Sequence, residues 1–167
     1  NLSSSKKGWE ERWMEFSHSA QDAQRIRKQL LNLVDEDTNS FNAIMAAFQL
    51  PKDNDEEKKI RKQTIQAATK YAIEVPFKVM ELSLEAVRLT KSMAETGNPN
   101  SITDAGVGAM CARVAVSGAF MNVKINCTSY DDKNFTADII KRGVEIEDEA
   151  KRIELEVLEL VEGSINK

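Results

Sequence analysis

Apolar residues recur every three or four positions along most of the chain, which is the spacing of one face of an α-helix. Strict alternation of apolar and polar residues is rare, and only three prolines and seven glycines interrupt the sequence. We therefore expect an all-α protein, an antiparallel helical bundle with long helices and short connections. With 167 residues, the chain is expected to form a single helical domain over residues 1–167.

The periodic segments predict where the outer helices of this bundle lie. The first helix is expected over residues 9–48, with a bend near 18–20. It ends before Pro51, because proline disfavours helix in the residue that precedes it. A final helix is expected over about 136–161, after a polar loop at 130–134.

A second helical stretch is expected to begin with Asp53 or Asp55 as its N-cap and to end at Gly97. Pro76 lies inside this stretch and removes one backbone donor, so we expect it to bend or break the helix. The start of the stretch is basic, which is usual for a solvated helix face but also suits an anchor for a carboxylate tail. These basic residues are Lys58, Lys59, Arg61 and Lys62.

The segment 101–127 is predicted to be the central, small-residue-rich helix of the bundle. Ser101 is expected to accept a hydrogen bond from the amide of Asp104, whose side chain reaches back. Small residues then share one face, flat enough for a second helix to approach closely: Gly108, Cys111, Ala115 and Gly118. Glycine inside a helix costs about 1 kcal/mol relative to alanine, so close packing is expected to offset that cost.

Polar residues stand at both ends of this face. Asp104 and Asn122 are eighteen residues apart, five whole turns, so they point the same way roughly 27 Å from each other. Asn126 follows one turn later, where its amide suits either a flat heterocycle edge or helix-end capping. Arg113, Asn122 and Lys124 interrupt the apolar run, so a membrane span is not expected.

Asp37 is the most informative candidate for chemistry. At about 100° per residue it falls in the middle of an apolar stripe that includes Val34, Phe41 and Phe48. A carboxylate that faces a core is expected to have a raised pKa, which suits general acid or base catalysis. The alternative is a structural aspartate bonded to a neighbouring helix end or to an arginine.

Composition limits the other function classes. A net charge of −4 argues against nucleic acid as a partner. Cys111 and Cys127 fall on opposite sides of one helix and are expected to be reduced packing thiols. His18 is the only histidine, so histidine-rich zinc or di-metal sites are not expected, nor is any other metal site. No targeting or membrane segment is recognisable, which favours the cytoplasm, and a start at Asn1 suggests that an upstream segment is missing.

Four stretches together resemble the formiminotetrahydrofolate cyclodeaminase / methenyltetrahydrofolate cyclohydrolase family. They are LVDEDTNSFNAIMAAFQLPK (33–52), IEVPFKVMELSLEAV (73–87), GNPNSITDAGVGA (97–109) and GAFMNVKIN (118–126). The resemblance implies an all-helical fold, a folate substrate, and assembly into dimers or larger rings. It also implies that the reaction needs neither a metal nor an organic cofactor. It implies a cyclodeaminase, which closes 5-formiminotetrahydrofolate to 5,10-methenyltetrahydrofolate with loss of ammonia.

The residue pattern and the resemblance meet at Asp37, and we hypothesise that it is the catalytic acid/base. Asp104, Asn122 and Asn126 match the family's pattern and are expected to orient the substrate. Lys52, and after it the basic cluster from Lys58, is expected to hold the glutamate tail of folate, including polyglutamated folate. Family members have a glycine- and serine-rich stretch and an alanine-rich helix upstream of Asn1, so the site is expected to be incomplete if that segment contributes to it.

Three readings remain open at the level of sequence. The first is the cyclodeaminase, and the second is the cyclohydrolase, in which water is the nucleophile on the same fold. The third is a non-catalytic helical assembly module, which predicts that a structural partner neutralises Asp37. Because Asp104 and Asn122 are too far apart to hold one small ligand head, we expect two central helices to pair antiparallel in a homodimer. Asp104 of one subunit then lies near Asn122 of the other.

Overall fold

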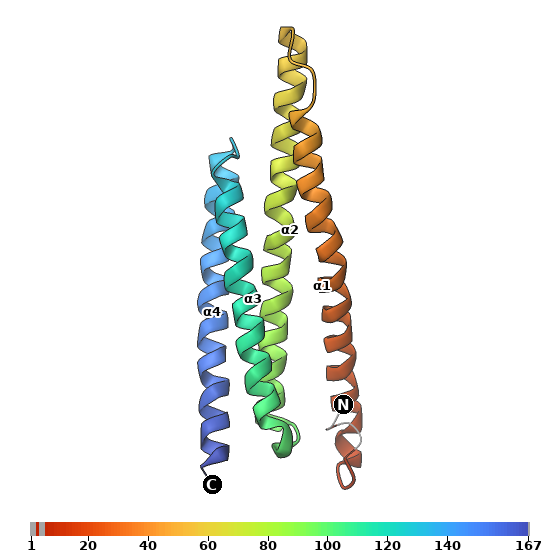
Figure 1. The fold of residues 1–167 in the computed structure, drawn as a ribbon. Coiled ribbons are helices and arrows are strands. Elements are labelled where there is room, and N and C mark those ends of the chain that lie inside the picture. The colour runs from red at the N-terminus through yellow and green to blue at the C-terminus, as the bar shows by residue number, and fades with distance from the viewer. Residues whose placement is uncertain (1–2, 4–5, 167) are drawn as a thin grey trace.

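The computed structural model describes residue 3 and residues 6–166, and the described residues form four long α-helices and no strand (Figure 1). The long helices are α1 (Trp13–Phe48), α2 (Asp55–Thr96), α3 (Ile102–Cys127) and α4 (Lys133–Ile165). Two short 3-10 helices, η1 (Glu10–Arg12) and η2 (Pro99–Ser101), precede α1 and α3. The prediction of an all-α bundle of long helices is confirmed.

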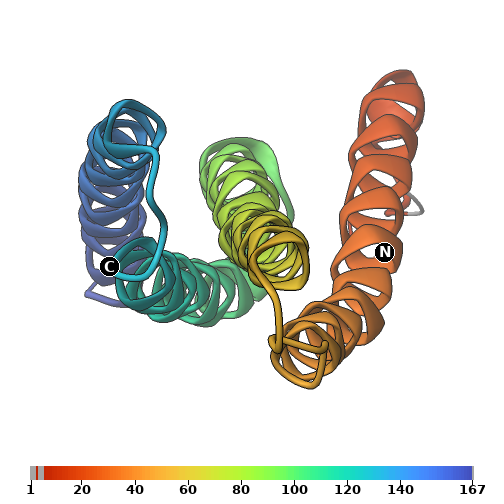
Figure 2. The same ribbon diagram turned by 90° about the horizontal axis from the view of Figure 1, so that it is seen from above.

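Successive long helices run antiparallel, and α2 lies between α1 and the pair formed by α3 and α4 (Figure 2). Helices α2, α3 and α4 all pack on one another, whereas α1 packs mainly on α2. α1 and α2 are close at their upper connection and separate toward the lower end of the molecule (Figure 1). The bundle is therefore open on the side between α1 and α3.

The main hydrophobic core is a three-helix core, because its buried residues come from α2, α3 and α4. Its fully buried members include Ile73, Met80, Val87, Ala109, Val116, Val123, Ala150 and Val157. Burial of each of the larger side chains, from valine to methionine, stabilises a fold by about 1.5–3 kcal/mol. α1 buries few residues in comparison, namely Phe16, Ile26, Ser40 and Ala47.

Helix α2 runs without a break from Asp55 to Thr96, with Pro76 buried inside it. Of the two expected effects of Pro76, a break in the helix does not occur. The hydrogen bond that replaces the missing one is described below. α1 likewise continues without interruption through residues 18–20.

Two predicted caps differ from expectation: the cap of α2 is a neighbouring residue, and Ser101 is the N-cap of α3 without a side-chain hydrogen bond. Asn54, rather than Asp53 or Asp55, is the N-cap of α2, and its side chain accepts from the Glu57 amide at 2.9 Å. The Glu57 carboxylate in turn accepts from the Asp53 amide at 2.8 Å, which completes a reciprocal pair. Ser101 makes no side-chain capping bond, because it ends η2, whose own N-cap Asn98 accepts from the Asn100 amide.

The stretch Pro99–Cys127 is long and apolar enough to cross a membrane by length and composition alone, with a mean hydropathy of 1.3 in its most apolar window. One-third of that window is buried inside the bundle. A core helix of a soluble protein passes the same test, so this is weak evidence for a membrane.

Candidate functional site

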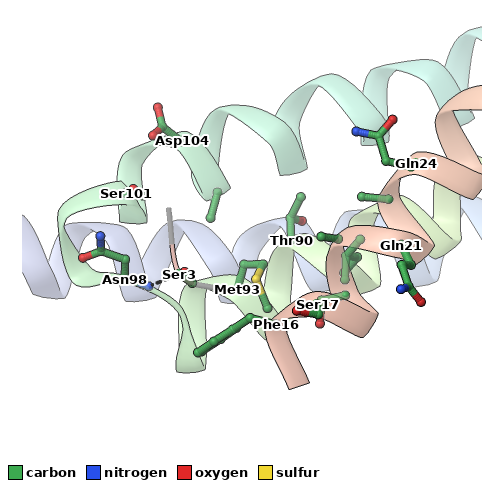
Figure 3. Close-up of a pocket in the computed structure, with 15 residues that line it drawn as sticks. Ser3, Phe16, Ser17, Gln21, Gln24, Thr90, Met93, Asn98, Ser101 and Asp104 are labelled. Carbon is green, nitrogen blue, oxygen red and sulfur yellow. Dashed lines mark hydrogen bonds between the residues drawn. The ribbon is translucent and has the colours of Figure 1, made fainter. Parts of the chain in front are cut away.

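A groove opens where α1 separates from the other helices. Its volume is about 880 Å³, within the range of small-molecule sites. It lies between the first half of α1, the end of α2 and the start of α3 (Figure 3). Its lining includes Phe16, Ala20, Ala23 and Gln24 from α1, Leu89, Thr90 and Met93 from α2, Ser101 from η2, and Asp104 and Ala105 from α3.

Asp104 is the one predicted site residue that lines this groove. It lies in the first turn of α3, where a carboxylate is stabilised by the helix dipole. Figure 3 places Asp104 and Gln24 on opposite sides of the groove, with Thr90 and Met93 between them. An apolar floor with polar groups at the rim is the usual construction of a site for a flat organic ligand.

The groove-lining residues of α1 and α2 were not predicted from the sequence. Phe16, Thr90 and Met93 lie at apolar or neutral positions of amphipathic helices, as core residues do. What exposes them to the groove is the separation of α1 from α3, and no local sequence signal reports that separation.

Asp37 does not face the core of the single chain, and that prediction is wrong. The face of α1 that packs on α2 carries Ile26, Ser40 and Ala47, all buried. Asp37 lies at the edge of this face and is exposed. The apolar stripe on which the prediction depended is real, but α2 covers only one side of it. The desolvation expected of Asp37 therefore needs a cover that the single chain does not supply.

Asn126 and Asn122 differ in their surroundings. Nδ2 of Asn126 donates to the backbone carbonyl of Ala72 in α2 at 2.7 Å, which ties the upper part of α3 to α2. Asn122, one turn earlier, is exposed. At the other end of the same helix pair, a Cβ on Gly108 would lie 3.1 Å from Cγ2 of Thr90. Of the small-residue face that was expected to pack closely on a second helix, Gly108 meets α2, whereas Cys111, Ala115 and Gly118 are exposed.

The predicted site residues fall into two groups at different heights of the bundle. The Tyr71 hydroxyl contacts the carboxylate of Glu36, the neighbour of Asp37, while Asn126 bonds to Ala72. Asp37 and Asn126 therefore flank the same level of α2 from opposite sides. Asp104 lies at the lower end, eighteen residues from Asn122 and roughly 27 Å away along α3. A single chain does not bring the two groups together.

Tyr71 is a polar residue of the upper group that sequence reasoning missed. The hydrogen bond to Glu36, followed by desolvation, raises the pKa of the Tyr71 hydroxyl, so this group keeps its proton at neutral pH. Its signal in the sequence was weak, because one tyrosine in a long amphipathic helix is ordinary.

Lys52 lies exposed in the connection between α1 and α2, at the upper end of the molecule. The basic cluster beside it is partly neutralised by acidic neighbours. Nζ of Lys58 lies 3.2 Å from the Asp55 carboxylate, and Nζ of Lys62 lies 2.9 Å from that of Asp131. Arg61 instead donates to the carbonyl of Phe48 at the end of α1. These exposed pairs contribute about 0–1 kcal/mol each, so the lysines remain free to exchange partners.

Two apolar stripes are left uncovered by the chain. The α1 stripe consists of Leu31, Val34, Phe41, Met45 and Phe48, and the α3 stripe consists of Val107, Met110, Val114, Met121 and Ile125. The exposed fractions of these ten side chains range from 39% to 65%. Gly118 lies in the α3 stripe, and a Cβ there would meet nothing within 4 Å. Patches of this size usually mark contacts with other molecules.

His18 is exposed, and the residues that the structure describes contain no group of three histidine, cysteine, aspartate or glutamate side chains placed to hold a metal ion. Cys127 is buried and Cys111 is exposed on α3, both as free thiols. Neither thiol lines the groove.

Comparison with known proteins relates the whole chain to folate enzymes. The sequence profile of the family described as Formiminotransferase-cyclodeaminase matches residues 1–145. The chain is 32% identical over 166 residues to a methenyltetrahydrofolate cyclohydrolase of Methylorubrum extorquens. This alignment covers 99% of this chain and 80% of that protein. It is 33% identical over 134 residues to the formimidoyltransferase-cyclodeaminase of Gallus gallus. This second alignment covers 80% of this chain and 25% of that protein.

A solved structure supports the fold. The crystal structure of a formiminotetrahydrofolate cyclodeaminase from Thermotoga maritima matches 96% of this chain and 76% of that chain, with a TM-score of 0.83. The two sequences are 24% identical over the match, so this likeness concerns the fold.

Proposed function

The chain belongs to the formiminotransferase-cyclodeaminase family, and from that membership we propose that it is a formimidoyltetrahydrofolate cyclodeaminase of one-carbon folate metabolism. Its proposed substrate is 5-formiminotetrahydrofolate, and its products are 5,10-methenyltetrahydrofolate and ammonia. The observation that carries the proposal is the family match over residues 1–145. Classification as an ammonia-lyase, a role in histidine degradation and a cytoplasmic location are parts of the same proposal.

A methenyltetrahydrofolate cyclohydrolase is the second candidate. The relative from Methylorubrum extorquens has that name and aligns with 99% of this chain. The two activities act on related folates, and both need a proton-transferring group beside the bridging carbon. A non-catalytic assembly module is the third candidate, and it predicts neither activity.

The proposed chemistry needs one group that transfers protons in both directions. N10 of the folate attacks the formimino carbon, the N10–C bond forms, and the bond from that carbon to the departing nitrogen breaks. The formimino nitrogen enters protonated (=NH2+). N10 gives up its proton, the departing nitrogen gains one and leaves as ammonia, and the positive charge stays on the methenyl bridge. A carboxyl group that accepts the first proton and donates the second serves both steps, and we assign this role to Asp37. No metal or organic cofactor takes part in the proposed steps.

The substrate-orienting groups in this proposal are Asp104, Asn122 and Asn126, with Lys52 as the contact for the glutamate tail. Binding of a polyglutamated folate is expected to weaken with added salt, because Lys52 is exposed and its attraction to carboxylates is screened. Tail affinity that does not change with salt would argue against Lys52.

We further propose that a second copy of the chain completes the site. The α1 and α3 stripes together contain ten half-exposed side chains. At roughly 150 Å² for each free side chain, they offer on the order of 800 Å², which is the area that one partner contributes to a standard interface. Burial of the α1 stripe would also desolvate Asp37 at its edge. With α3 helices antiparallel across a two-fold axis, Asp104 of one subunit approaches Asn122 of the other.

Mixing two variants tests the shared site. Asp37→Asn and Asp104→Asn are each expected to be inactive or nearly so as homodimers. After unfolding and refolding together, half of the dimers are mixed, and each mixed dimer has one intact site. The mixture is then expected to recover about a quarter of wild-type activity. Absence of recovery, with mixed dimers demonstrated, would place the whole site in one subunit.

The reaction itself is tested by ammonia release from 5-formiminotetrahydrofolate, with wild type and Asp37→Asn measured side by side. Loss of activity in a folded Asp37→Asn variant supports both the reaction and the role of Asp37. Hydrolysis of the methenyl bridge without ammonia release supports the cyclohydrolase. Equal turnover in both proteins rejects Asp37 as the acid/base, and no turnover of either folate by the wild type rejects an enzyme on this chain.

A further inference from the structure

Arg12 links the beginning of α1 to the end of α2. Its Nη1 donates to the backbone carbonyl of Thr96, the last residue of α2, at 2.9 Å. Nε and Nη2 of the same guanidinium donate to the Glu15 carboxylate at 2.9 and 2.8 Å. The last carbonyls of a helix lack intrahelical partners and attract cations, so Arg12 is well suited to cap α2.

Aromatic rings hold this guanidinium in place. Trp9 and Phe16 stack with their ring centroids 5.5 Å apart, and Cζ of Arg12 lies 4.5 Å from the Phe16 ring and 5.5 Å from the Trp9 ring. Nζ of Lys6 lies 4.2 Å from the Trp9 ring. We call Lys6, Trp9, Arg12 and Phe16 the N-terminal clasp. The negative face of an aromatic ring attracts a cation at these distances.

The N-terminal clasp bounds the lower end of the groove. Phe16 is buried and belongs to both the clasp and the groove lining. Nζ of Lys6 donates to Oδ1 of Asn98 at 3.4 Å, and Asn98, in the connection between α2 and α3, also lines the groove. α1 and α2 separate toward this end (Figure 1), and the clasp joins the two helices there through the bond from Arg12 to Thr96.

We propose that Arg12 is a positioning residue that sets the spacing between α1 and the connection from α2 to α3. This spacing is the width of the groove in which Asp104 lies. The effect on folate binding rests on the proposed function, whereas the effect on spacing does not. Arg12 touches neither the groove interior nor Asp104 and acts through the placement of α1.

A distance measurement tests the spacing directly. Spin labels are attached at Gln21→Cys on α1 and Thr103→Cys on α3, both exposed, in a background in which Cys111 and Cys127 are replaced by alanine. Arg12→Met keeps the apolar stem over the rings but loses the bond to Thr96, and we expect a longer and broader distance distribution. Arg12→Lys keeps the charge, and its distance distribution is expected to lie between those of wild type and Arg12→Met. The matched control is Arg27→Met. Arg27 is an exposed arginine of α1 that forms no ion pair with the residues that the structure describes.

Steady-state kinetics with the folate that wild type turns over test the consequence. Arg12→Met is expected to raise KM about fivefold or more while kcat stays within about twofold, because a positioning residue for binding does not touch the reacting atoms. Arg27→Met is expected to change neither constant. An unchanged distance distribution in Arg12→Met overturns the proposal. A wider groove with an unchanged KM overturns the consequence for folate binding and leaves the role of Arg12 in spacing standing. If wild type turns over no folate, the proposed function fails while the distance measurement still decides the role of Arg12 in spacing.

Discussion

The side-chain amide of Asn126 in α3 takes the place of a backbone amide that α2 lacks. In a regular α-helix, the N–H of residue 76 would donate to the carbonyl of Ala72, but Pro76 has no N–H. Ala72 is only 4% exposed, so water has little access to its carbonyl. Nδ2 of Asn126 donates to that oxygen at 2.7 Å. The bond lets α2 continue through the proline and fixes the height of α3 against it.

A double-mutant cycle between Pro76 and Asn126 follows from this relationship. Asn126→Ala leaves a buried carbonyl without a donor and is expected to lower the free energy of unfolding by about 1–3 kcal/mol. In a Pro76→Ala background the carbonyl regains an intrahelical donor, so the same change is expected to cost less than half as much. Urea denaturation of the four proteins measures the coupling.

Asn122→Ala is the control for this cycle, because Asn122 is exposed on the same helix. Its effect on stability is expected to stay within about 0.5 kcal/mol in both backgrounds. Equal losses for Asn126→Ala with and without Pro76 would mean that the two residues are not coupled.

Two glycines of the bundle predict opposite effects of the same substitution. A Cβ on Gly143 of α4 would clash with the ring of Phe120, whereas a Cβ on Gly118 of α3 would meet nothing within 4 Å. Gly143→Ala is expected to destabilise the protein by about 1–3 kcal/mol through overpacking. Gly118→Ala is expected to stabilise the single chain by about 0.5–1 kcal/mol through helix propensity.

Oligomeric state adds a second measurement for the glycine pair. If a second copy packs closely on the α3 stripe, Gly118→Ala weakens association while it stabilises each chain, and sedimentation at several concentrations detects this. A Gly118→Ala protein that associates as tightly as wild type would exclude close helix contact at this glycine.

The ion pair between α3 and α4 is partly buried. Nε of Arg113 lies 2.8 Å from Oε2 of Glu154, with 11% of the Glu154 side chain and 30% of the Arg113 side chain exposed. Glu154→Ala leaves a charge that water reaches only in part, so we expect a loss of about 1–3 kcal/mol in unfolding free energy. The double change Arg113→Met with Glu154→Leu is expected to lie within about 1 kcal/mol of wild type. A double variant that is as unstable as Glu154→Ala alone would contradict this expectation and show that apolar side chains do not replace the pair.

The two thiols are expected to differ in reactivity. Burial raises the pKa of the Cys127 thiol, and the charge of Lys133 opposes this shift more weakly. Cys111 is exposed. At pH 8, iodoacetamide is expected to modify Cys111 in the native protein and Cys127 only after unfolding, as mass spectrometry of the peptides would show. Equal modification rates would mean that Cys127 is accessible in the native bundle.

The raised pKa of Cys127 also predicts how stability depends on pH. The folded state holds the thiol proton more tightly than the unfolded state, in which the thiol has a pKa of about 8.5. The stabilising contribution is therefore complete below that pH and is lost as pH rises through the higher folded-state pKa. Denaturation curves from pH 8 to 10 are expected to show this loss in wild type and a smaller slope in Cys127→Ala.

Local patterns in the sequence were sufficient for the helices and for part of the site. The spacing of apolar residues predicted each long helix, since that spacing is a property of neighbouring turns. The groups on α3 were also placed correctly relative to one another, because Asp104 and Asn122 share a rigid helix. Asp37 was placed in an apolar stripe for the same reason. That stripe proved wider than the single contact that α1 makes with α2, so Asp37 is exposed.

By itself, the sequence determined the all-α class, the helix periodicity, the family resemblance and the order of polar groups along each helix, since all of these depend on residues close in sequence. Only the tertiary structure decided which side of each stripe is covered, that Asn126 serves the carbonyl freed by Pro76, and that a groove opens between α1 and α3. These features depend on how helices pack, and packing is set by contacts between residues such as Arg12 and Thr96 that lie far apart in the chain.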